Sequence, residues 1–170
     1  IVGRLADAQR SLEKADDYSG IQSYSAGIKL VDFHLRYRRP DLAAEALKRV
    51  TSKAPEVPAV LLAAASVALA NGDAKGASAH LARVASAANN NPTLLVRVAL
   101  MQQQANNVVG AVYSAEKALE ARPNFAPAMA LLSELEMRRG DLQKAEKLAR
   151  QLVAANPRSG VGHALLGEIA

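Results

Sequence analysis

Hydrophobic side chains recur along this chain at spacings of three and four residues, in segments that polar turns separate. Such spacing places the apolar residues on one side of an α-helix. The clearest examples are Leu131, Leu132 and Leu135, followed by Ala145, Leu148, Ala149 and Leu152. The longest apolar run, residues 59–70, contains Ser66 and is 12 residues long, too short to span a bilayer. We therefore expect an all-α chain in which residues 59–70 form a buried helix.

Two segments of the chain are imperfect copies of one another. Residues 140–157, GDLQKAEKLARQLVAANP, resemble residues 106–123, NNVVGAVYSAEKALEARP, and their final prolines lie 34 residues apart. With Pro157 at position 32 of a 34-residue unit, the same register extends back to Tyr24 without an insertion. A fixed period of this length is typical of repeat proteins, so we expect a single array. Its parts are a half repeat at about 1–23, repeats at about 24–57, 58–91, 92–125 and 126–159, and a partial repeat at 160–170.

Each repeat predicts two helices, helix A at about positions 2–14 and helix B at about positions 16–30. Small residues at positions 8 and 20 would let the two helices approach closely. Asp73 and Asp141 are predicted to cap the start of helix B. Pro55, Pro123 and Pro157 are predicted to end it, because the residue before a proline avoids the helical conformation.

The first repeat deviates from this pattern. Its predicted cap, Asp41 after Pro40, stands at position 18, two residues after the position 16 that Asp73 and Asp141 occupy. We therefore expect a longer turn and a shorter helix B in this repeat. Further upstream, we interpret Asp16 and Asp17 as loop residues.

The repeated residues resemble those of the tetratricopeptide repeat. They are Gly-Asp at positions 15 and 16, Ala at 20, a small or aliphatic residue at 27 and Pro at 32, with a period of 34. The aromatic residues that the family usually has at positions 4, 11 and 24 are missing. The resemblance implies an α-solenoid of stacked antiparallel helix pairs wound as a right-handed superhelix. In such an array each unit buries the apolar face of its neighbour.

Both ends of the chain fall inside a repeat. Residues 3–15, GRLADAQRSLEKA, resemble GDLQKAEKLARQL and so correspond to the second half of a repeat. Residues 160–170 lack the polar character with which natural arrays usually end. We therefore expect the full protein to continue beyond both ends.

The net charge of +5 and the pI near 9.7 raise the question of nucleic-acid binding. The positive surplus is spread along the chain and forms no basic block. The densest cluster, Arg36, Arg38 and Arg39, is interpreted as a solvated helix end. The chain has no cysteine, which excludes disulfides and thiolate metal sites within it. We expect no nucleic-acid partner, and no membrane insertion of this segment.

No group of residues predicts catalysis. His34, His80 and His163 lie far apart and form no metal-binding motif. Glu134 and Glu136 are two residues apart on a helix, so they do not share a face. We therefore expect no catalytic site, no cofactor, no metal and no enzyme activity.

The family resemblance implies that helix A lines a concave groove, mainly through positions 2, 5, 9, 12 and 13. The Lys, Asn and Arg residues with which chaperone-binding members of the family clamp a carboxylate are absent from these positions. An extended or helical peptide with apolar anchors would suit such a groove. Two alternatives stay open, namely a solvated inner face and a groove filled by a second copy of the chain. The candidate groove residues are Ile28, Asp32, Arg36, Leu62, Ser66, Leu69, Val96, Leu100, Gln103, Gln104, Ala130, Glu134, Met137 and Arg138.

The favoured function is therefore a non-catalytic scaffold that binds a protein or peptide. The alternatives are a regulatory repeat segment of a larger enzyme and an RNA-binding helical-repeat protein. The Ala- and Leu-rich style of the repeats also resembles bacterial envelope proteins, of the lipoprotein type associated with exosortase and PEP-CTERM sorting or exopolysaccharide export. That resemblance implies a periplasmic or outer-membrane-associated protein rather than a cytoplasmic one.

Overall fold

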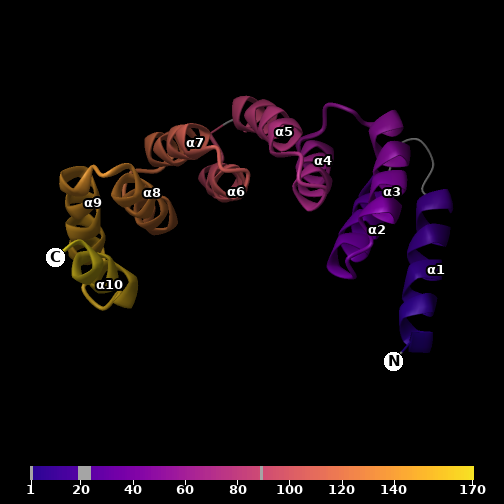
Figure 1. The fold of residues 1–170 in the computed structure, drawn as a ribbon, viewed down its shortest axis with the longest axis horizontal. Helices are drawn as coiled ribbons and strands as arrows, with labels where there is room; N and C mark the ends of the chain where they lie inside the picture. The colour runs from indigo at the N-terminus through magenta and orange to yellow at the C-terminus, as the bar shows by residue number, and fades with distance from the viewer. Residues whose placement is uncertain (1, 19–23, 89) are drawn as a thin grey trace. The chain divides into compact units, whose positions relative to one another are not determined.

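The computed structural model describes residues 2–18, 24–88 and 90–170. These residues form ten α-helices and contain no β-strand (Figure 1). The helices are α1 Val2–Tyr18, α2 Ser25–Arg36, α3 Pro40–Lys53, α4 Pro58–Ala70, α5 Ala74–Ala87, α6 Pro92–Gln104, α7 Val108–Ala121, α8 Ala126–Arg139, α9 Leu142–Ala155 and α10 Gly160–Ile169. The predicted all-α class is confirmed.

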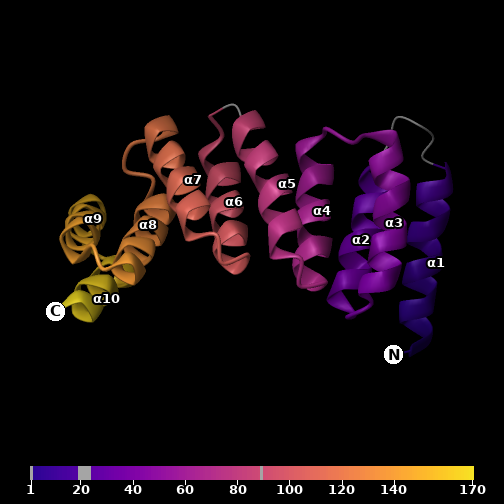
Figure 2. The same ribbon diagram turned by 45° about the horizontal axis from the view of Figure 1, so that its top comes forward.

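The helices belong to two compact units, Ile1–Val84 and Ala85–Ala170. In the first unit, α2 packs against α1 and α3, and α4 packs against α2 and α3. In the second unit, α6 pairs with α7, and α8 packs against α6, α7 and α9, while α10 packs against α8 and α9. Figure 2 shows the antiparallel course of the pairs α2/α3 and α6/α7. Each unit is therefore built of stacked helical hairpins, in which contacts join elements that are close in sequence.

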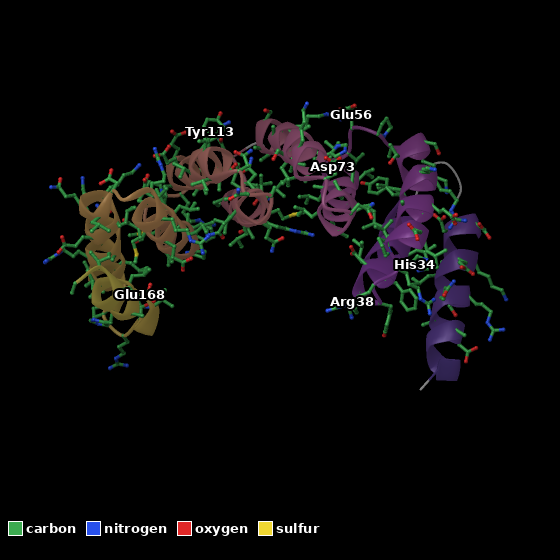
Figure 3. The ribbon with its side chains drawn as sticks, viewed as in Figure 1. His34, Arg38, Glu56, Asp73, Tyr113 and Glu168 are labelled. Carbon is green, nitrogen blue, oxygen red and sulfur yellow. The ribbon has the colours of Figure 1, made fainter. Side chains whose placement is uncertain are left out.

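In all four repeats the turn between helix A and helix B passes through a left-handed residue at position 15. Arg38, Gly72, Asn106 and Gly140 have φ values of 55°, 75°, 56° and 83°. The prediction of a longer turn and a shorter helix B in the first repeat is wrong. Helix α3 has 14 residues, as do α5, α7 and α9, because Arg38 (labelled in Figure 3) adopts the conformation that glycine supplies elsewhere.

The predicted caps of helix B are confirmed in two repeats. The Asp73 carboxylate accepts a hydrogen bond from the backbone N–H of Gly76 at 2.8 Å, and Asp141 accepts one from Lys144 at 3.0 Å. The prediction for Asp41 is wrong. Arg39 is the N-cap residue of α3, because Pro40 takes the first helical position, where its missing N–H leaves no hydrogen bond unmade.

Two asparagines cap helices that the sequence left without a predicted cap. The Asn91 side chain accepts a hydrogen bond from the N–H of Leu94 at 3.0 Å, at the start of α6. Asn107 accepts one from Gly110 at 2.9 Å, at the start of α7. Asn107 stands at position 16, so the cap of helix B is kept in this repeat although its residue type changes.

The predicted helix ends are confirmed. Helices α3, α7 and α9 each end two residues before the proline at position 32, as expected when the residue before proline avoids the helical conformation. Their last residues are Lys53, Ala121 and Ala155.

Positions 8 and 20, where the sequence predicts that helix A and helix B meet, are occupied by buried residues in every repeat. All eight are fully buried. In the fourth repeat, the hydroxyl of Ser133 at position 8 donates a hydrogen bond to the backbone oxygen of Ala145 at position 20, at 2.9 Å. A bond of this length places the two backbones close together, as predicted. The eight residues are Val31, Ala65, Ala99 and Ser133 at position 8, and Ala43, Ala77, Ala111 and Ala145 at position 20.

The interpretation of Asp16 and Asp17 as loop residues is wrong, because α1 extends to Tyr18. Asp16 is 2% exposed, and its carboxylate lies 3.4 Å from Nε of Arg49 and 3.6 Å from Nζ of Lys53 on α3. A Cβ atom added to Gly27 on α2 would meet Asp16 Oδ1 at 2.8 Å. Glycine at this position and two cations on α3 together make room for a buried carboxylate at the end of α1.

The left-handed turn of the first repeat predicts an unusual response to mutation. Arginine pays a steric cost of about 1 kcal/mol in this conformation, and glycine does not. Glycine also makes the unfolded chain more flexible, so we expect Arg38→Gly to raise the free energy of unfolding by about 0.5 kcal/mol net. Urea denaturation followed by circular dichroism measures this value.

The matched control is Arg97→Gly, because Arg97 is exposed inside α6. Glycine inside a helix costs about 1 kcal/mol, so the control variant should be less stable than the parent. A loss of stability in Arg38→Gly equal to that in Arg97→Gly would show that position 38 is not held in the left-handed conformation.

Candidate functional site

The A helices of each unit lie against one another and carry the predicted groove residues. Helix α2 contacts α4 in the first unit, and α6 contacts α8 in the second. The structure therefore brings the predicted residues together as two sets, one on α2 and α4 and one on α6 and α8.

The second set combines an exposed apolar side chain with polar neighbours. Leu100 on α6 is 44% exposed, although large apolar side chains are usually buried. Gln104 on the same helix and Glu134 and Arg138 on α8 are also exposed. This face therefore offers an apolar contact together with amide and charged groups of both signs. The half-buried members of the set are Gln103, Ala130 and Met137.

The first set is more polar at its surface. Asp32 and Arg36 on α2 are exposed, while Ile28, Ser66 and Leu69 are half-buried. The hydroxyl of Ser66 donates a hydrogen bond to the backbone oxygen of Leu62 at 3.0 Å, within α4. That hydroxyl is therefore already engaged by its own helix.

Several predicted anchors belong to the core instead of the surface. Leu62 is 5% exposed and Val96 is 9% exposed, so a partner could reach little of either side chain. Ile28 packs against one buried hydrophobic cluster, and Ala130 and Met137 pack against another. Leu100 is the predicted apolar residue with the largest exposed fraction, which makes α6 and α8 the stronger candidate surface.

The sequence did not predict a series of buried polar side chains at repeat position 11. His34, Gln102 and Glu136 all stand at this position, and each is at most 3% exposed. Gln102 accepts a hydrogen bond from the hydroxyl of Ser114 at 2.7 Å. The available signal was the absence of the aromatic residue expected at position 11, which these polar residues replace.

Glu136 is buried with two cations beside it. Its carboxylate lies 3.0 Å from NH1 of Arg139 and 2.7 Å from Nζ of Lys144 on α9. Lys144 also lies 2.8 Å from Glu116 on α7, and its hydrogen bonds to Glu116 and then to Glu136 raise its pKa. These ion pairs connect α7, α8 and α9. Glu136 is buried whereas Glu134 is exposed, so the prediction that the two glutamates occupy different faces of the helix is confirmed.

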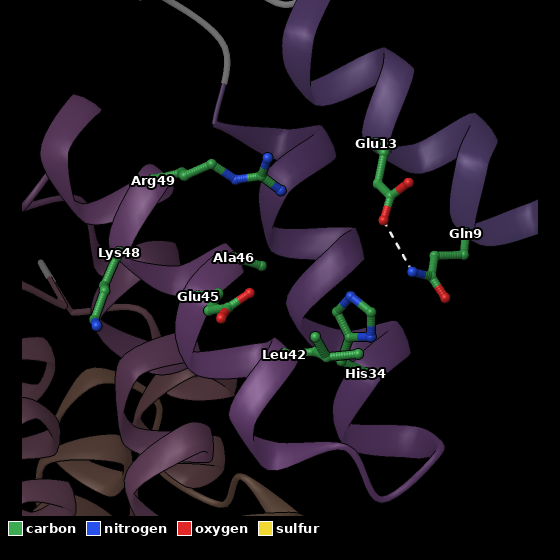
Figure 4. Close-up of a pocket in the computed structure, with 8 residues that line it drawn as sticks. All are labelled: Gln9, Glu13, His34, Leu42, Glu45, Ala46, Lys48 and Arg49. Carbon is green, nitrogen blue, oxygen red and sulfur yellow. Dashed lines mark hydrogen bonds between the residues drawn. The ribbon is translucent and has the colours of Figure 1, made fainter.

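His34 differs from the other two, because its Nδ1 atom is buried without a hydrogen-bond partner among the described residues. The ring lines a cleft of about 430 Å³ between α1 and α3 (Figure 4). Burial lowers the pKa of His34, and the nearby Arg39 charge lowers it further. The imidazole is therefore neutral at neutral pH.

This environment predicts a pH-dependent stability. Because the pKa of His34 is lower in the folded chain than the ordinary 6.5, the unfolded chain takes up the proton more readily. The stabilising contribution is present above about pH 6.5 and is lost as the pH falls through and below that value. We expect the free energy of unfolding in urea to fall more between about pH 7 and pH 5 for the parent than for His34→Gln.

Glutamine is the matched replacement, because Gln102 stands at the same repeat position. All other titrating groups are common to both proteins, so the difference between the two pH profiles isolates His34. Parallel profiles would contradict the assignment.

The described residues contain no cluster of three or more His, Asp or Glu side chains that could hold a metal ion. Among the same residues, no helix is both long enough and apolar enough to cross a membrane. The predicted groove residues line none of the hollows described on α1 and α3, on α5 to α7, and on α9.

A family model described as a tetratricopeptide repeat matches residues 34–103 and 102–169. No curated protein matches the chain significantly. Among solved structures, a tetratricopeptide repeat protein from Parabacteroides merdae ATCC 43184 is 19% identical, with a TM-score of 0.76, over 98% of this chain and 66% of that one. MamA from Desulfovibrio magneticus RS-1 is 14% identical, with a TM-score of 0.71, over 93% of this chain and 89% of that one.

A third similar structure is YrrB, described as having an unusual peptide-binding site. It is 13% identical, with a TM-score of 0.66, over 93% of this chain and 81% of that one. At these identities the three structures establish a shared fold.

Proposed function

Because the chain belongs to the tetratricopeptide repeat family, we propose that it is a non-catalytic interaction scaffold that binds a peptide on its A helices. The observation that carries the proposal is Leu100, an exposed leucine one helical turn from the exposed Gln104 on α6, a helix that packs against α8 with its exposed Glu134 and Arg138. An apolar anchor surrounded by hydrogen-bonding groups suits a peptide that buries one apolar side chain and pairs its polar groups at the rim.

The similarity to YrrB supports the proposal, because a protein of this fold is described as binding a peptide. The site proposed here is the surface of α6 and α8, with Leu100 at its centre. The Asp32 and Arg36 surface on α2 is a second, more polar contact area in the other unit.

The same proposal includes a biological setting. The style of the repeats favours a bacterial envelope role, in the periplasm or at the outer membrane, in protein sorting or exopolysaccharide export. The partner is then a protein or peptide of that assembly, and neither a nucleic acid nor a cofactor is required. A regulatory segment of a larger enzyme would use the same surface to hold the enzyme's own chain.

Selection of peptides from a random display library, followed by fluorescence polarisation, tests the surface without a known partner. We expect Leu100→Ser to weaken the selected peptides about tenfold or more, because a buried leucine side chain contributes about 1.5–3 kcal/mol. The matched control is Leu142→Ser, because Leu142 on α9 is 49% exposed and lies outside the surface. Equal losses in both variants, or no loss in Leu100→Ser, would overturn the proposed site.

A further inference from the structure

The turn between α2 and α3 differs at position 15 from the other three turns between helix A and helix B. Those turns place Gly72, Asn106 or Gly140 in the left-handed conformation, which these residue types tolerate. The first turn places Arg38 there instead, with a φ of 55°. A Cβ atom added to Gly72 or Gly140 would meet nothing within 4 Å, so a side chain at this position has no neighbour to pack against in those turns. Packing therefore gives no reason for the arginine.

Position 16 of the same turn departs from the pattern as well. Asp73, Asn107 and Asp141 each accept a hydrogen bond from a backbone N–H at the start of helix B. Arg39 makes no such bond, because a guanidinium group has donors and no acceptor. The first turn thus lacks both residue types that stabilise the other turns and has arginines in their place. Departures of this kind from local rules are expected at functional sites.

The arginines of this turn are exposed and carry no ion pair. Arg36, Arg38 and Arg39 are all exposed. None of them lies within ion-pair distance of a carboxylate of the described residues. Arg39 donates a hydrogen bond to the neutral amide of Gln9 at 3.2 Å, which leaves its charge unbalanced. Residues 36–41 set three guanidinium groups against the single carboxylate of Asp41, so the turn is positively charged.

The other turns do not present such a group of cations. Positions 13–16 of the second and third repeats contain no lysine or arginine. In the fourth repeat Arg139 lies 3.0 Å from the Glu136 carboxylate, which leaves Arg138 beside the cap Asp141. A cluster of three unpaired guanidinium groups therefore occurs at the first of the four turns and at none of the others.

An aromatic side chain stands in the middle of this cluster. Tyr37 follows Arg36 and precedes Arg38, and it is 42% exposed. Its ring centroid lies 4.8 Å from that of the half-buried Phe33, one helical turn earlier on α2. Figure 3 labels Arg38 at the end of α2, where this turn begins. The turn therefore offers an apolar contact together with an excess of positive charge.

We propose that the turn between α2 and α3 binds a short acidic segment of a partner protein. Its Asp or Glu carboxylates pair with Arg36, Arg38 and Arg39, and a neighbouring apolar side chain packs on Tyr37. The planar guanidinium group matches a carboxylate through two parallel hydrogen bonds, which makes arginine well suited to this partner. The exposed tyrosine ring adds apolar contact area and a hydroxyl that can donate to a further carboxylate.

The surroundings of the turn favour an acidic peptide over a nucleic acid. Nucleic acids present a continuous line of phosphates, and proteins bind them with cations placed along that line. Here the cations are confined to one turn. The exposed Asp32 stands one helical turn before Arg36, and the exposed Asp41 follows Pro40 directly. A long polyanion would meet these carboxylates, whereas a short acidic segment can place its charges between them.

This inference rests on the proposed scaffold function and gives a partner chemistry to its second contact area, to which Arg36 belongs. The first contact area, at Leu100, lies in the other unit. Loss of peptide binding at Leu100 would therefore leave the acidic segment bound at the turn, and either proposal can fail alone.

Blocked peptides test the proposal on the whole chain. The probe is acetyl-Gly-Glu-Glu-Leu-Glu-Glu-Gly-amide, and the comparison peptide has glutamine in place of every glutamate. A uridine pentanucleotide with four phosphodiester groups supplies the same charge as the probe. NMR titration follows the backbone amides of residues 36–39 and the ring signals of Tyr37. We expect saturable shifts with the acidic peptide, no saturation with the glutamine peptide and weaker binding of the oligonucleotide.

Variants of the turn separate binding from folding. Arg38→Gln should weaken the acidic peptide about threefold, as expected for a partly exposed ion pair. The double variant Arg38→Gly with Arg39→Asp restores the residue types of Gly140 and Asp141, so it should fold at least as stably as the parent. It should nevertheless weaken the peptide about tenfold or more, because it also turns a cation into an anion.

The matched control is Arg97→Asp, which reverses an exposed charge on α6 in the other unit and should leave the affinity unchanged. Leu100→Ser should also leave it unchanged. Equal binding of the glutamine peptide, tighter binding of the oligonucleotide, or full affinity in the double variant would overturn the proposal. So would the absence of saturable binding of the acidic peptide in the millimolar range.

Discussion

The close approach of helix A and helix B in every repeat is the constraint on which the rest of the structure depends. It is set at positions 8 and 20, which are fully buried in all four repeats and hold Ala or Ser everywhere except at Val31. Because a larger side chain at either position would separate the helices, alanine dominates this contact. The left-handed residue at position 15 and the N-cap residue at position 16 then reverse the direction of the chain at the same repeat position in every unit. Stacking of these hairpins buries the apolar faces that each hairpin leaves open.

Three of the four repeats carry a buried polar residue at position 11, and its surroundings differ from one of them to the next. Gln102 bonds to Ser114, Glu136 is paired with two cations, and the His34 ring has a buried nitrogen without a partner among the described residues. A buried polar group without a partner costs free energy, and Nδ1 of His34 is one such group, as is Nδ1 of His80 on α5. The exposed Leu100 is the corresponding exception among apolar residues. The site proposed at Leu100 therefore rests on a residue that breaks the general rule for its type.

The sequence predicted the features that depend on local chemistry and on the period. These include the helix pairs, the caps at Asp73 and Asp141, the helix ends before proline and the small residues at positions 8 and 20. It failed at Arg38 because a left-handed arginine has no sequence signature, so the following helix was expected to start late. It failed at Asp16 because the buried environment comes from Arg49 and Lys53, more than 30 residues away along the chain.

The candidate groove could be predicted only in outline. Family positions place the candidate residues on α2, α4, α6 and α8, which lie against one another as two pairs. They did not distinguish surface from core at Leu62, because α4 is apolar on all sides and its pattern marks no exposed face. Leu100 and Val96 stand one helical turn apart and differ in exposure because of packing between helices, which the spacing alone does not reveal.

The stability of Ala111→Asp tests the central constraint most directly. Ala111 stands at position 20 and is fully buried, so the variant places an unpaired charge between helix A and helix B. We expect it to lose about 3 kcal/mol or more of unfolding free energy, or to lose its helical circular dichroism signal altogether. The control Ala79→Asp, at an exposed site on α5, should remain folded with nearly the parent stability. An Ala111→Asp chain as stable as the parent would contradict the repeat register and the close helix approach built on it.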